Sequence, residues 1–163
     1  NEPYAAKYTS EFDYDVADGE HYLLAFLSRS YHESIKTSGA HTAMKIQVAN
    51  KSIADVSAIK EPMLFYSRPK GTYIGKSDTE KIMLDFYPVN AEMGKGGYKV
   101  QVDINGEQTE ILESWSPQFI EGLPMGENTI KLTLLNNDGS VADVPLNPVS
   151  RTFTLKEDPA PGQ

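Results

Sequence analysis

Alternating apolar and polar positions dominate the chain, and this period of two predicts strands. The clearest stretch is 98–104, where one face carries Tyr98, Val100, Val102 and Ile104. Asn105-Gly106 follows directly and predicts a tight hairpin, because both central positions of the favoured turn need a positive φ. The return strand is expected at 107–112. Further strands are expected at 22–27, 41–48, 63–66, 81–87, 129–135 and 151–155.

Helical periodicity is absent beyond a single turn, which 30–36 could form. The apolar runs have the length of strands and are separated by Gly, Pro, Asn and Asp at short spacing. This pattern predicts an all-β protein built as an antiparallel β-sandwich.

An internal echo suggests a partial duplication. Residues 17–27 align with 124–134, and each segment is a Gly-Glu turn that leads into a strand. A second strand follows each of them, at 42–48 and at 152–155. We interpret the N-terminal part as the closing half of one sandwich repeat. Half a sandwich leaves an unpaired edge, and unpaired edges recruit strands from other chains.

Three segments near the C-terminus carry a resemblance to a known family. They are 122–132 (GLPMGENTIKL), 136–141 (NNDGSV) and 149–155 (VSRTFTL). They resemble a bacterial immunoglobulin-like domain, in which a Leu-x-x-Gly-x-(Asn/His)-x-(Val/Ile)-x-Leu segment precedes an Asp-Gly hairpin and a final edge strand. The resemblance implies an immunoglobulin-like sandwich at 61–157, preceded by an arm and a shorter β unit at 1–60 and followed by a tail at 158–163. It implies a fold and no activity.

A second resemblance concerns two basic connections, 28–36 (SRSYHESIK) and 66–73 (YSRPKGTY). The pair is similar to segments of uncharacterised exported bacterial proteins, and it implies a periplasmic or extracellular location without catalytic residues. The chain begins at Asn1 rather than Met, and its first residues are polar and rich in Tyr. We interpret it as the mature form of an exported protein.

Composition excludes several classes of function. The 163 residues include 15 Lys and Arg against 23 Asp and Glu, so the formal net charge is −8. This acidic balance argues against nucleic acid as a partner. The chain has no Cys, which excludes disulfides, zinc–thiolate sites and thiol nucleophiles. No apolar run approaches the roughly 18 residues of a membrane span, so we expect no transmembrane segment. No cofactor is expected.

Two groups of residues raise the question of a metal. His21, His32 and His41 are the only histidines, but their spacing matches no compact ligand motif. Asp13, Asp15 and Asp18 precede Gly19 with one residue too many for a calcium-binding EF-hand loop. We expect scattered histidines and a solvated loop, so no metal site is assigned. A metal-binding β-sandwich remains an alternative.

Catalysis has little support. His32 and Glu33 could act as a base and an acid, but adjacent residues point apart on a helix or a strand. No Ser lies in a Gly-x-Ser-x-Gly elbow. We therefore expect no catalytic residues and no enzymatic activity.

The sequence thus predicts a non-enzymatic exported binding or scaffold module, an accessory subunit of a larger envelope or membrane-bound complex. It would contact other protein subunits through edge-strand pairing and through loop residues, which we expect to be Arg29, Tyr31, His32, Arg68, Lys70, Tyr73 and Trp115. The alternative is a carbohydrate-binding module, which needs a row of exposed aromatic residues on one sheet face. Aromatic residues also recur in the N-terminal arm, where they could lie along a partner or cover the protein's own core: Tyr4, Tyr8, Phe12 and Tyr14.

Overall fold

The structure, a computed structural model, describes residues 4–159. Within this range the chain forms eleven strands, one 3-10 turn and one four-residue helix, which confirms the all-β class. Residues 160–163 of the predicted tail and the first three residues of the predicted arm lie outside the described residues. No helix in the described part is long and apolar enough to cross a membrane.

Two sheets form a sandwich in the C-terminal part. One has the order β4-β6-β9 and consists of β4 (Met63–Arg68), β6 (Lys81–Val89) and β9 (Gln118–Glu121). The other has the order β5-β11-β10-β7-β8 and consists of β5 (Gly71–Ile74), β11 (Val149–Lys156), β10 (Gly126–Leu135), β7 (Lys99–Ile104) and β8 (Gln108–Leu112). Every pairing is antiparallel except the one between β5 and β11. This strand order is that of an immunoglobulin-like sandwich, as predicted.

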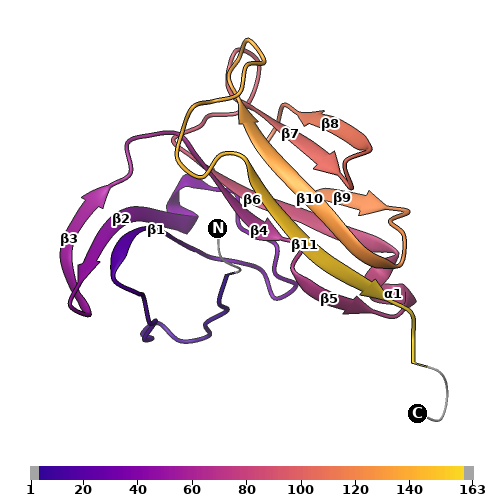
Figure 1. The fold of residues 1–163 in the computed structure, drawn as a ribbon, viewed down its shortest axis with the longest axis horizontal. Coiled ribbons are helices and arrows are strands. Elements are labelled where there is room, and N and C mark those ends of the chain that lie inside the picture. Colours follow the sequence, from indigo (N-terminus) through magenta and orange to yellow (C-terminus); the bar gives the residue numbers. More distant parts are fainter. Residues whose placement is uncertain (1–3, 160–163) are drawn as a thin grey trace.

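A third sheet lies N-terminal to the sandwich. It has the order β1-β2-β3 and consists of β1 (Gly19–Phe26), β2 (His41–Ala49) and β3 (Ser52–Ala58), with the 3-10 turn η1 (Ser38–Ala40) before β2. Figure 1 shows it on the far side of β4 and β6 from β10 and β11. The sheet containing β4 and β6 is therefore the middle layer of three.

The middle layer has a core on each of its faces. Toward β10 and β11 it contributes Leu64, Tyr66, Ile82, Leu84 and Phe86. Toward β1 and β2 it contributes Met63, Phe65, Tyr87 and Val89. A strand that is covered on both faces carries apolar residues on both, because neither face meets water. This explains why 63–66 is apolar without alternation.

The β7–β8 hairpin confirms the turn predicted from Asn105-Gly106. Asn105 has φ 52° and Gly106 has φ 73°, and β7 buries Val100, Val102 and Ile104 on one face.

The sequence pattern did not predict three of the strands or the short helix, namely β3, β5, β9 and α1 (Lys76–Thr79). Strands β5 and β9 are four residues long, and all residues of β3 are exposed, so pairing with neighbouring strands rather than local pattern defines them.

Candidate functional site

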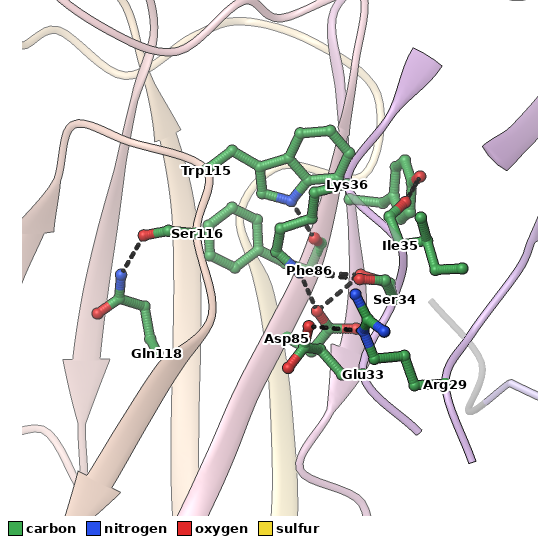
Figure 2. A network of polar contacts seen from close by, with 11 residues as sticks. Arg29, Glu33, Ser34, Ile35, Lys36, Asp85, Phe86, Trp115, Ser116 and Gln118 are labelled. Atoms are coloured by element: carbon green, nitrogen blue, oxygen red, sulfur yellow. Dashed lines mark hydrogen bonds and ion pairs between the residues drawn. The ribbon is translucent and has the colours of Figure 1, made fainter. Parts of the chain in front are cut away.

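The connection between β1 and β2 is fixed to the middle sheet by a buried ion pair. Asp85 on β6 is 1% exposed, and its Oδ1 lies 2.7 Å from Lys36 Nζ. Ser34 Oγ donates a hydrogen bond of 2.7 Å to the same oxygen, and Tyr87 Oη donates one of 2.7 Å to the Ile35 carbonyl. Figure 2 shows Ser34 and Lys36 converging on Asp85. The basic connection is therefore held firmly over β6.

Trp115 lies at the same junction. Its Nε1 donates a 2.8 Å hydrogen bond to the Phe86 carbonyl (Figure 2). Its ring centroid lies 4.5 Å from that of Tyr87. The indole packs against both core clusters. Trp115 therefore packs within the protein, and the partner contact expected from the sequence stays a prediction.

Arg29 and Tyr31 lie on the exposed part of this connection. Arg29 Nε is 3.7 Å from Glu33 Oε1, and the Tyr31 ring is exposed. Neither residue contacts the ion pair at Asp85 among the interactions of the described chain.

The second basic connection, residues 66–73, lines a cleft that we call the basic cleft. It is an open cavity of about 500 Å³ lined by Arg68, Lys70, Gly71, Thr72 and Tyr73. Arg68 Nη1 and the Lys70 backbone N–H both donate to Tyr73 Oη at 3.3 Å. The β4–β5 turn therefore presents its guanidinium, its ammonium and a phenol together.

Tyr4 of the arm covers one side of the basic cleft. Its Oη accepts a 2.9 Å hydrogen bond from Arg68 Nε, and its carbonyl accepts one of 2.9 Å from Lys70 Nζ. The same ammonium lies 3.9 Å from the Tyr4 ring centroid, within cation–π range. His32 lies beside this ring at 6.4 Å between centroids. The structure thus brings together His32, Arg68, Lys70 and Tyr73 of the predicted contact residues.

Burial and like charge perturb two groups in the basic cleft. The pKa of Lys70 is lowered by desolvation first and then by the charges of Arg68 and Arg151. The pKa of His32 is lowered by desolvation first and then by Arg68 and Lys70. Protonation of His32 is therefore disfavoured, and the two cations that line the cleft are Arg68 and Lys70.

The three histidines occupy three separate environments. His21 Nε2 lies 2.8 Å from the Ala17 carbonyl, His32 borders the basic cleft, and the His41 ring packs 4.7 Å from Tyr87. His21 pairs with Ile46 and His41 with Phe26, at opposite ends of the β1–β2 hairpin. Among residues 4–159 no group of three or more His, Asp or Glu side chains is arranged to hold a metal ion.

Asp18 has a structural partner within the predicted acidic loop. Its carboxylate accepts backbone hydrogen bonds from Asn50 at 3.1 Å and Lys51 at 2.9 Å. Both residues have positive φ, so Asp18 stabilises the tight β2–β3 turn.

The strand pairing of the third sheet repeats the pairing found in the sandwich. Gly19 pairs with Val48 in β1–β2 as Gly126 pairs with Leu155 in β10–β11. Aligned residues of β1 and β10 differ, however, in whether they face the middle sheet. Ile130 and Leu132 of β10 face the sandwich core, whereas the aligned Leu23 and Ala25 lie on the face of β1 opposite Tyr22, Leu24 and Phe26, which pack on the middle sheet.

The outward face of the third sheet is apolar and ends in an open edge. Ile46 and Val48 of β2 are buried on this face, and their partners on β3, Val56 and Ile53, are 56% and 63% exposed. All seven residues of β3 are exposed, and the strand has no neighbour beyond β2 among the described residues. It carries one charge, Asp55, and no Pro, and its pairing with β2 has an irregular register next to Val48.

Exposed aromatic side chains do not form a row on a sheet within the described chain. They are Tyr8, Phe12 and Tyr14 in the arm, Tyr31 in the β1–β2 connection and Phe119 on β9.

Comparisons with known proteins add a distant likeness of fold. No protein-family model matches the sequence, and no curated protein matches it. A solved structure of fibronectin(III)-like modules of CbhA from Clostridium thermocellum is 14% identical, covering 60% of this chain and 100% of that one, with a TM-score of 0.42. The fold class assigned above follows from the strand order of the chain itself.

Proposed function

We propose that the protein is a non-enzymatic, exported binding module, an accessory subunit that joins other proteins of an envelope or membrane-bound complex. The observation that carries this proposal is the open edge of β3, which is exposed along its whole length. An edge strand offers a row of unpaired N–H and C=O groups, and an extended segment of a partner can add to it as a further strand.

The apolar outward face supports the same role. Its counterpart on β10 and β11 is covered by a second sheet, and the N-terminal hairpin repeats their pairing. We infer that this hairpin is a partial repeat and that a partner's strand completes it. Ile53 and Val56 would then contact apolar side chains of that strand, which adds specificity to the main-chain hydrogen bonds.

Hydrogen exchange tests the proposal directly. In the assembly isolated from the cells that make the protein, the amides of β3 should exchange more slowly than in the isolated chain, because a partner strand accepts their hydrogen bonds. Strand β8, an edge strand of the sandwich, is the internal control and should exchange at the same rate in both. An assembly in which β3 exchanges as fast as in the isolated chain would refute strand addition at this edge.

A further inference from the structure

The basic cleft holds two cations without an acidic partner. Within residues 4–159 neither Arg68 nor Lys70 forms an ion pair. Their side-chain hydrogen bonds end on neutral oxygens, the two phenols of Tyr4 and Tyr73 and the carbonyl of Tyr4. Asp85, which is opposite Arg68 in the β4–β6 register, is already paired with Lys36.

Several donors in the basic cleft remain for a ligand. A guanidinium has five N–H donors, and Arg68 uses Nε and Nη1 for one phenol each. Lys70 donates one hydrogen bond from its ammonium, which has three N–H groups. The two cations border the same open cavity of about 500 Å³. An oxyanion there would accept charge-assisted hydrogen bonds from both.

We propose that the basic cleft binds a carboxylate group on an acidic segment of a partner protein. A carboxylate carries one negative charge and two acceptor oxygens, one for each cation. Two cations also balance a phosphate dianion, so the choice of a carboxylate follows from the proposed function, in which the partner is a protein, and inorganic phosphate is the competing ligand in the test. The inference rests on the proposed function only in taking the partner to be a protein, and it uses a surface other than β3.

Nuclear magnetic resonance with a triglutamate peptide blocked at both ends tests the assignment. The Arg68 Nε–H signal and the amides of Gly71 and Thr72 should shift saturably, and the affinity should fall as salt is added. Arg68→Gln/Lys70→Gln should lower the affinity about tenfold or more, since charge-assisted hydrogen bonds are lost. The matched control Lys60→Gln/Lys95→Gln removes the same charge from exposed positions and should bind like wild type.

A second variant covers the case in which the double substitution releases Tyr4 and disturbs the fold. Thr72→Glu keeps both cations and places a carboxylate on the exposed rim of the cleft, so it should compete with the peptide and weaken binding. Absence of saturable shifts in wild type, or equal loss in the lysine control, would overturn the assignment. Stronger binding of inorganic phosphate at the same signals would overturn the choice of carboxylate.

Failure here is distinguishable from failure of the proposed function. Ile53→Lys/Val56→Lys alters the β3 edge and should leave peptide affinity unchanged. If the assembly is intact but Arg68→Gln/Lys70→Gln leaves the peptide affinity unchanged, the assignment of the basic cleft is contradicted and the proposed function is not.

Discussion

At the residue scale, the buried ion pair of Lys36 and Asp85 joins the β1–β2 connection to the sandwich. Asp85 is almost fully buried, and its side-chain partners, Lys36 and Ser34, lie about fifty residues away in sequence. Such a pair need not add net stability, because both charges lose their hydration. Removal of one partner is different, since it leaves the other buried and uncompensated.

Lys36→Met should therefore lower the free energy of unfolding by about 3 kcal/mol. Lys36→Met/Asp85→Asn should recover most of that loss, because no unpaired charge remains in the interior. Denaturant titration of the wild type, both single variants and the double variant measures the coupling. A double variant no more stable than Lys36→Met would contradict the account of this junction.

At the scale of elements, the strands with regular alternation were predictable and the paired edges were not. Strand β7 could be recognised because every second residue is buried. Strand β3 could not, because all its residues are exposed and only pairing with β2 makes it a strand. The unbroken apolar stretch at β4 was a usable signal that a strand is covered on both faces, and with it a third layer could have been expected.

The candidate site was predictable in part for a related reason. The residues of each basic connection stood out in an acidic chain, but their meeting depends on β1–β2 packing over β4 and β6, which no local pattern encodes. The sequence left open whether Tyr4 contacts a partner or the protein itself. In the structure Tyr4 accepts hydrogen bonds from Arg68 and Lys70. The packing of Trp115 could not be predicted, because its neighbours Ser114, Ser116 and Pro117 have the composition of an exposed turn.

The hairpin turn between β7 and β8 gives an element-scale prediction. Gly106→Ala should lower the free energy of unfolding by about 1 kcal/mol, because φ at this position is 73° and a Cβ disfavours the left-handed region. Gly39→Ala is the matched control, since no heavy atom lies within 4 Å of its added Cβ and its φ is outside the left-handed region. Thermal unfolding of the two variants compares them. Equal losses in both would contradict the turn assignment.

At the scale of the whole molecule, the protein is a sandwich with an additional sheet packed on its outer face. The middle sheet has a core on both of its faces, whereas the added sheet ends in the exposed strand β3 (Figure 1). The polar junction at Asp85 fixes the connection that leads from β1 to β2 and borders the basic cleft. This arrangement gives the proposed strand-acceptor edge a rigid support, so that a partner would find it already formed.

Native mass spectrometry of the protein isolated gently from its own cells tests the central claim most directly. The account predicts a species heavier than the 18.0 kDa chain that is lost in Ile53→Lys/Val56→Lys. It should persist in Ile111→Lys, which places a single lysine on the exposed edge strand β8. Both sets of substitutions are at exposed positions and should change stability by no more than about 0.5 kcal/mol per site. A species of 18.0 kDa alone in the wild type, or an assembly that survives the β3 substitutions unchanged, would contradict the account.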